Sequence, residues 1–235
     1  MKINELPTPC YVIDENIIEE NCKVLADVMK KTGCHVLLAQ KAFSNYALYP
    51  LIGKYLSGTT ASGLYEARLG REEMGRENHV FAPAYKDEDM DELVKICDHI
   101  VFNSISQLEK HKEKCRNVSI GIRVNPEFST QDGHEIYDPC GKGSRLGVTA
   151  GLLRNADLTG IDGLHFHTLC EQNSDDLKKT LDVVEEKFDF LLRKVKWVNF
   201  GGGHHITRKD YDVELLCDCI THIKAVSYTH LTLPT

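Results

Sequence analysis

Short apolar segments alternate along the chain with longer amphipathic stretches. Several of these segments are nearly continuously apolar, which is typical of strands buried on both faces of a parallel sheet. We therefore predict strands over eight segments. They are Cys10–Ile13, His35–Ala39, Gly58–Ala61, His79–Phe81, Ile100–Phe102, Ser119–Val124, Leu164–His167 and Trp197–Phe200.

The stretches between these segments carry apolar residues at helical spacing. In residues 15–30, for example, Cys22, Leu25 and Met29 fall on one face of a helix. Ser104 and Ser174 stand where side chains commonly cap the start of a helix. The predicted helices are Glu15–Lys30, Leu64–Met74, Glu88–Cys97, Ser104–Cys115, Ser174–Leu192 and Asp210–His222.

Alternating strands and helices predict an α/β fold, and a (β/α)8 TIM-type barrel needs eight strand–helix units. Only seven such units can be counted from His35 onwards. Residues 225–235 contain no Asp, Glu, Lys or Arg and no helix stop signal, and they resemble translated vector sequence. We expect residues 225–235 to be a non-native tail. We expect a barrel over residues 15–224 that lacks its last unit, with an open sheet as the alternative.

Composition and charge narrow the class of protein. The 235 residues are 42% hydrophobic and 27% charged, with a net charge of −7 and no basic block of the kind that binds nucleic acid. The nine cysteines form no C-x-x-C pair, and we find neither a signal peptide nor an apolar run of membrane-spanning length. We expect a cytoplasmic enzyme with free thiols that binds neither nucleic acid nor a membrane.

Lys41 is the first residue that suggests chemistry. It follows the predicted strand His35–Ala39 and so stands at the carboxyl end of that strand, where barrels place their active sites. Contact with apolar strand residues would strip water from the amine and favour its neutral, nucleophilic form. By position alone, a surface lysine in a strand–helix loop is the simpler interpretation.

Two other strand ends carry small or polar residues. Residues 61–66, Ala-Ser-Gly-Leu-Tyr-Glu, join a strand to a helix that Ser62 could cap. Gly201, Gly202 and Gly203 directly follow the strand that ends at Phe200. Three glycines after a strand let backbone N–H groups approach an anion such as phosphate, although a tight turn would use them equally well.

His165 and His167 lie two residues apart on a predicted strand and therefore share one face. Two imidazoles on one face are compatible with a metal pair of the kind that barrel amidohydrolases hold. In that class the His-x-His pair lies on the first strand and precedes a bridging lysine, whereas here Lys41 comes first. We therefore expect no metal, and instead expect one imidazole to stack on a flat cofactor.

Arg123 ends another strand, and Asn125-Pro126 begins an extended loop that runs to Ser144-Arg145-Leu146-Gly147. A loop of this length inside a compact domain is usually functional. An acidic loop that binds substrate and one that is merely solvated are equally compatible with the sequence. The candidate residues are Glu127, Asp132, Glu135, Asp138 and Arg145.

The ordered set of strand ends resembles that of the alanine-racemase-fold (fold type III) decarboxylases, which depend on pyridoxal 5'-phosphate (PLP). Ornithine and diaminopimelate decarboxylases belong to this family. The segment Leu164–Asn173, LHFHTLCEQN, points most specifically to its carboxynorspermidine (carboxyspermidine) decarboxylase branch. The other matching segments are Gln40–Ala42, Ala61–Glu66, Arg123–Pro126, Ser144–Gly147 and Asn199–Gly203.

The resemblance implies PLP as cofactor, carried by Lys41 as a Schiff base. It implies that His167 stacks on the cofactor ring, that Arg123 lies near the ring, and that Gly201, Gly202 and Gly203 bind the phosphate. Cys170 stands where relatives have a serine near the phosphate, so its hydrogen bond would be weaker. Residues 141–143, Gly-Lys-Gly, depart from the Ala-Pro expected there, which puts the local loop shape in doubt.

The same resemblance implies the reaction and the missing parts. The reaction would be decarboxylation of carboxynorspermidine or carboxyspermidine, small cationic polyamines, to norspermidine or spermidine by a homodimer. Residues 1–14 would supply a strand to a second, β-rich domain that is mostly absent here. The carboxylate that keeps the ring protonated would also be absent, so we expect this fragment to be inactive. The alternatives are another PLP enzyme of this fold, a non-catalytic homologue and, last, a metal-dependent barrel hydrolase.

Overall fold

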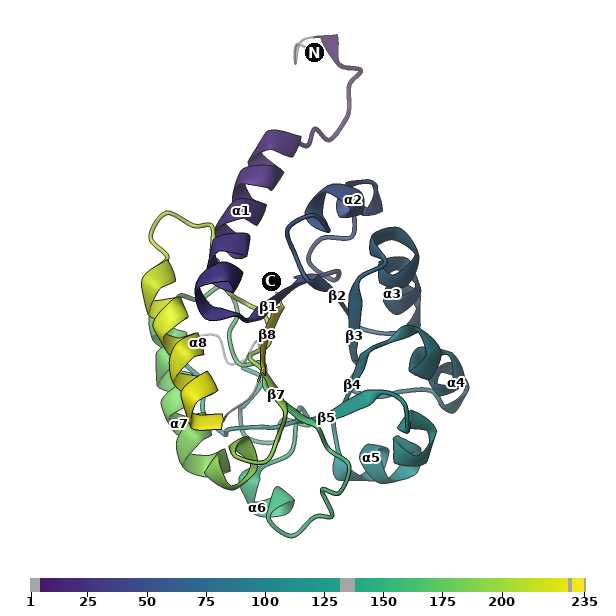
Figure 1. Ribbon diagram of the computed structural model, residues 1–235, viewed down its shortest axis with the longest axis vertical. Coiled ribbons are helices and arrows are strands. Elements are labelled where there is room, and N and C mark those ends of the chain that lie inside the picture. Colours follow the sequence, from purple (N-terminus) through teal and green to yellow (C-terminus); the bar gives the residue numbers. More distant parts are fainter. Residues whose placement is uncertain (1–4, 132–137, 228–229, 235) are drawn as a thin grey trace.

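A closed barrel of eight parallel strands, surrounded by helices, makes up the molecule (Figure 1). The computed structural model describes residues 5–131, 138–227 and 230–234. Each strand pairs with the next in chain order, and β8 pairs with β1. The strands are β1 His35–Ala39, β2 Gly58–Ala61, β3 Glu77–Phe81, β4 His99–Phe102, β5 Ser119–Arg123, β6 Gly163–His165, β7 Trp197–Asn199 and β8 His230–Pro234.

The helices cover the outside of the barrel. They are α1 Glu15–Thr32, α2 Tyr49–Ile52, α3 Leu64–Leu69, α4 Asp87–Ile96, α5 Ile105–His111, α6 Ala150–Leu153, α7 Ser174–Leu192 and α8 Val213–Ser227, with short 3-10 or π segments η2 Tyr46–Leu48, η3 Gly70–Met74 and η4 Lys112–Cys115. None of the helices in the described part of the chain is both long and apolar enough to span a membrane.

Seven predicted strands, from His35–Ala39 to Trp197–Phe200, are confirmed to within two residues at either end. The six predicted helices are present as well, and the predicted Leu64–Met74 continues from α3 into the π-helical segment η3. The cap at Ser104 is confirmed, because its side chain accepts a hydrogen bond from the Gln107 N–H. The cap at Ser174 is wrong: Asn173 takes that position, and the Ser174 hydroxyl donates to the carbonyl of Asp212 at 2.8 Å instead.

The prediction that the barrel lacks its last unit is wrong. Strand β8 pairs with both β7 and β1, so that Thr232 lies opposite Asn199 on one side and His35 on the other. Without β8, two strand edges would carry unpaired backbone groups. The absence of charge that suggests a foreign tail is also what a buried strand requires, and Leu233 is fully buried. Helix α8 likewise extends past Lys224 to Ser227. The non-native origin of residues 225–235 stays a prediction.

The predicted strand Cys10–Ile13 is not a strand in the structure. Residues 6–14, which precede α1, form no helix or strand and lead away from the barrel (Figure 1). Tyr11 and Val12 are exposed, so the segment meets no strand edge with which it could pair. Its assignment to a second domain therefore stays a prediction.

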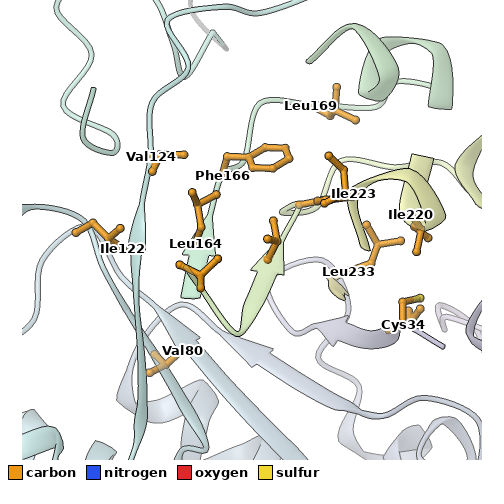
Figure 2. Close-up of a cluster of buried hydrophobic side chains, with 14 of the residues drawn as sticks. Cys34, Val80, Ile122, Val124, Leu164, Phe166, Leu169, Ile220, Ile223 and Leu233 are labelled. Carbon is orange, nitrogen blue, oxygen red and sulfur yellow. The ribbon is translucent and has the colours of Figure 1, made fainter. Parts of the chain in front are cut away.

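The main core lies between the barrel and the helices. Figure 2 shows Val80, Ile122 and Leu164 on the strands and Ile220 and Ile223 on α8, and all five side chains are fully buried. This packing holds the strands in fixed register and thereby fixes the positions of their carboxyl ends.

The indole ring of Trp197 lies against two glycines, Gly163 and Gly121, on other strands of the barrel. A Cβ atom at Gly163 would lie 2.0 Å from the indole ring, and one at Gly121 would lie 2.3 Å from it. Glycine at these positions on β5 and β6 therefore makes room for a tryptophan on β7.

Candidate active site

Lys41 stands just beyond the carboxyl end of β1, as predicted from the sequence. It is exposed rather than held against apolar strand residues, because the turn at residues 40–42 carries it clear of the strand. Its side chain lines a hollow of about 90 Å³ at the carboxyl ends of the strands. The residues that share this hollow with Lys41 are Ala39, Thr60, Ala61, Ser62, Phe81, Arg123, His165, His167, Gly201 and Gly202.

A second hollow of about 340 Å³ adjoins the first and shares Lys41, Arg123 and His167 with it. Cys170 lines this second hollow together with Pro139 and Leu146, which come from the long loop after β5. The two hollows form one site that is closed on one side by the barrel and bordered on the other by the loop.

The imidazole of His167 is fixed by the glycine turn. The backbone N–H of Gly202 donates to His167 Nδ1 at 2.8 Å, so the proton of the neutral ring lies on Nε2. Burial lowers the pKa of His167 to about 3, and the nearby charges of Lys41 and Arg123 act in the same direction. The ring is therefore neutral and held in one tautomer at neutral pH.

His165 has different partners from His167. Its Nδ1 lies 3.0 Å from the Asn199 side-chain oxygen, which also accepts the Gly201 N–H at 2.8 Å. Burial, reinforced by the charge of Arg123, holds the pKa of His165 well below its usual range. The two histidines thus engage separate hydrogen-bond partners, which gives no support to a metal pair.

The expected phosphate nest is occupied in part by the protein itself. The N–H groups of Gly201 and Gly202 are used by the side chains of Asn199 and His167. The carbonyl of Gly203 accepts from the N–H of Gln172 at 3.0 Å. The glycine turn therefore supports the site side chains as well as lining the hollow.

Arg123 is buried beneath the site, where its guanidinium lies 4.8 Å from the centre of the Phe81 ring. One of its terminal nitrogens donates to the carbonyl of His167 at 3.2 Å, whereas its Nε has no partner among the described residues. Burial lowers the pKa of Arg123 to about 10, so it remains a cation at neutral pH.

Ser62 lines the hollow but does not cap a helix through its side chain. Gly63 takes the N-cap position of α3, and the Ser62 N–H donates to the carboxylate of Glu66 at 2.6 Å. Glu66 lies in the first turn of α3. The pair closes the start of this helix and orients Ser62 toward the hollow.

Most of the candidate substrate-binding residues in the loop after β5 do not line the hollows. Glu127, Asp138 and Arg145 line neither hollow. Asp132 and Glu135 fall outside the described residues. Glu127 has a positive φ of 52°, which side chains rarely adopt and which is often found near functional sites.

Two residues that help to build the site were not predicted. Phe81 lies under the hollow, yet an apolar residue at a strand end cannot be told from core by sequence. Asn103 follows β4 directly and holds the far end of the loop, donating to the Arg145 carbonyl at 2.9 Å and accepting the Gly147 N–H at 2.8 Å. Asn103 could have been predicted as a site residue, because it is a polar residue that directly follows a buried strand.

The buried histidines predict how stability depends on pH. Below about pH 6.5 the unfolded chain protonates its histidines while the folded chain does not, because the lowered pKa values keep the buried rings neutral. The contribution of these buried rings is therefore complete above this pH and is lost as pH falls toward about 4, by up to ~1.4 kcal/mol per pH unit for each histidine whose pKa is lowered. The pKa is lowered for His79, His111, His165, His167 and His204, and raised for His35.

Urea titrations across this range should show a falling free energy of unfolding. His204→Gln should flatten the slope, because His204 is buried with a pKa of about 4. The matched control is His222→Gln, which alters an exposed ring paired with Glu185. A free energy of unfolding that stays constant between about pH 7 and pH 5 would contradict this account.

Comparison with known proteins finds similar decarboxylases both by sequence and by structure. No family model matches the chain. A carboxynorspermidine/carboxyspermidine decarboxylase of Campylobacter jejuni is 46% identical over 216 residues, which are 92% of this chain and 56% of that protein. A carboxyaminopropylagmatine decarboxylase of Synechocystis is 37% identical over 91% of this chain and 55% of that protein.

A solved structure shows the same similarity in three dimensions. The carboxynorspermidine decarboxylase of Campylobacter jejuni, in complex with norspermidine, superposes with a TM-score of 0.91 at 42% identity. The match covers 97% of this chain and 60% of that one. The chain thus spans little more than half the length of the relatives it matches.

Proposed function

We propose that this chain is the barrel part of a PLP-dependent decarboxylase that acts on carboxynorspermidine or carboxyspermidine. The enzymes that decarboxylate these two compounds are similar to it in sequence and in fold. The observation that carries the proposal is the hollow at the strand ends, which Lys41 shares with Arg123, His167 and the glycine turn. These four elements come from distant parts of the chain, and the family pattern predicts them together. The similarity favours this branch over the racemases and over a metal-dependent hydrolase.

The residues around the hollow fit PLP. The primary amine of Lys41 would hold the cofactor covalently, and the neutral ring of His167 would lie against its flat face. Gly201 and Gly202 line the hollow with backbone only, which leaves room for a phosphate. Arg123 Nε, buried and unpartnered among the described residues, would have an acceptor within the filled site. When bound, PLP supplies an electron-accepting ring that takes up the electron pair left by departing carbon dioxide.

The chain's own residues orient the reactants and control protons. The Gly202 N–H bond leaves His167 Nε2 as a donor, so this ring can stack and donate but cannot act as a base at neutral pH. Arg123 holds the backbone of His167 through its carbonyl and supplies a fixed positive charge below the hollow. Cys170 borders the wider hollow, where we propose that it lies near the phosphate.

Substrate binding is proposed for the loop after β5. The loop is tied to the site rim, since the side-chain nitrogen of Gln131 donates to the carbonyl of Cys170 at 3.3 Å. Its acidic residues would attract a cationic polyamine, and the net charge of −7 acts in the same sense. We propose Glu127 and Asp138, with Asp132, Glu135 and Arg145, as the substrate-facing candidates.

We also propose that a protein of the full length of the relatives forms a homodimer in the cytoplasm, and that its additional residues complete the active site. All nine cysteines are free thiols, as expected in a reducing compartment. No carboxylate is among the described residues that line the two hollows. We propose that the acidic partner of the cofactor ring belongs to the part of the relatives that this chain does not span, and that this chain alone is inactive.

Capture of PLP tests the proposal directly on this chain. The purified chain should bind PLP, and borohydride reduction should attach it permanently to one peptide, the one containing Lys41. Lys41→Ala should abolish the attachment, whereas Lys54→Ala, at a lysine that lines neither hollow, should leave it unchanged. Attachment that is spread over surface lysines, or that persists in Lys41→Ala, would reject the proposal. A non-catalytic homologue would capture PLP but never release carbon dioxide.

A further inference from the structure

The amino end of the barrel, opposite the proposed active site, holds a cluster of one carboxylate and three imidazoles. Glu77 begins β3, and His99 begins β4. His79 is two residues beyond Glu77 and therefore shares its face of the strand. His35 begins β1 and approaches Glu77 from another side. Barrel interiors are usually filled by branched apolar side chains, so such a polar cluster calls for an explanation.

The geometry of three members points to a metal site. His79 Nε2 lies 2.7 Å from Glu77 Oε1, and His99 Nε2 lies 3.4 Å from the same oxygen. In a tetrahedral zinc site with bonds of about 2.0–2.1 Å, ligand atoms are separated by about 3.3 Å. The ligand atoms of the three residues all lie within 4.8 Å of one another. Small side-chain shifts would therefore place all three around one ion.

The strands hold the imidazoles in place before any ion binds. His79 and His99 are paired residues on β3 and β4, and their rings stack with centres 4.0 Å apart. Trp197 packs edge-on against His99, with ring centres 5.1 Å apart. His79 is almost completely buried and His99 largely so. Such packing limits the movement of the two rings, so that only small shifts separate the present arrangement from one that holds an ion.

The hydrogen bonds around the cluster favour binding of a cation. Both carboxylate oxygens of Glu77 face imidazoles, because Oε2 lies 2.7 Å from His35 Nδ1 and Oε1 lies 2.7 Å from His79 Nε2. The Nδ1 atoms of His79 and His99 are buried without partners among the described residues. Each ring can carry its proton on Nδ1 and offer Nε2 to a metal, at the cost of a buried N–H that has no acceptor among the described residues.

The surroundings resemble the outer parts of metal sites. His35 Nδ1 lies 2.7 Å from Glu77 Oε2, the carboxylate oxygen that the other two rings do not use. Ligating carboxylates commonly carry such an orienting partner. A hollow of about 490 Å³ opens beside Glu77 and His99, and Arg71 and Arg76 line it. These cations favour a water, hydroxide or small anion in the remaining coordination position.

We propose that Glu77, His79 and His99 bind a divalent transition-metal ion of the zinc class, with His35 orienting the carboxylate and one coordination position open. Two imidazoles and one carboxylate form a ligand set that suits such ions. The site lies on β3 and β4, at the end of the barrel opposite Lys41. It is independent of the proposed decarboxylase function and of PLP.

Metal titration of the whole chain, after treatment with a chelator, tests this proposal. Calorimetry with Zn²⁺ should show one tightly bound equivalent. With Co²⁺ the protein should develop visible absorption of a four-coordinate ion, without the charge-transfer band that thiolate ligands produce. His99→Gln should weaken binding by more than about 100-fold, and His35→Gln by about 10–100-fold. His222→Gln, at an exposed Glu–His pair on the helices, should bind like the wild type.

The outcomes separate the possibilities. Circular dichroism should confirm that the variants fold, and the half-exposed ring of His35 makes His35→Gln less disruptive than His99→Gln. Absence of a stoichiometric site would overturn the proposal, leaving Glu77 as a hydrogen-bonding centre only. Equal affinity in the wild type and His99→Gln, or a thiolate charge-transfer band, would also overturn it by assigning the ion to another part of the molecule.

Discussion

Gly201→Ala is expected to lower the free energy of unfolding by about 2–5 kcal/mol and to weaken PLP binding by at least tenfold. The added Cβ would lie 2.5 Å from the carbonyl oxygen of Phe166 and 2.7 Å from Cα and Cβ of His167. Gly201 has a φ of 72°, where an L-residue costs about 1–2 kcal/mol, and the shift forced by overpacking costs about 1–3 kcal/mol more. The same shift would displace His167 from its place in the hollow. If only ~1.4 kcal/mol of this cost falls on the cofactor site, the affinity for PLP falls tenfold.

The matched control is Gly151→Ala on α6, where a Cβ would have nothing within 4 Å. Helical glycine at an open position should tolerate alanine and gain about 0.4–1 kcal/mol. Urea unfolding and fluorescence titration with PLP measure the two effects. Equal stability and equal PLP affinity in the two variants would show that the glycine turn does not support His167 in the way described.

Strand ends proved predictable because their signals are local. Lys41, Arg123, His167 and the glycines follow buried apolar segments, and parallel strands bring their carboxyl ends to one face. The structure accordingly gathers Lys41, Arg123, His167, Gly201 and Gly202 around one hollow. Each of these residues was ambiguous alone, and their order along the chain removed the ambiguity.

Other features depend on contacts that a sequence does not reveal. The charge-free segment 230–234 is equally compatible with a foreign tail and with a buried strand, and closure by pairing with β1 and β7 decided its conformation. The apolar segment Cys10–Ile13 lacks a partner edge and so forms no strand. The exposure of Lys41 is set by the turn after β1 rather than by the strand it follows.

Replacement of Lys41 is expected to abolish decarboxylation in a protein of the full length of the relatives. If Lys41 is the covalent attachment point, Lys41→Ala in a chain extended to the length of its relatives should reduce decarboxylation by more than about 1,000-fold, because nucleophile removal usually has effects of this size or larger. The fold should be retained, since the Lys41 side chain is exposed and lies outside the core. Circular dichroism and thermal melting of the variant provide the control.

Release of carbon dioxide is the most direct test of the central claim. The extended chain, loaded with PLP and supplied with carboxynorspermidine or carboxyspermidine, should release carbon dioxide and form an equal amount of norspermidine or spermidine. The present chain and the extended Lys41→Ala variant should not. No carbon dioxide from either substrate, or an unchanged rate in the Lys41→Ala variant, would contradict the assignment of this barrel to a decarboxylase that works through Lys41.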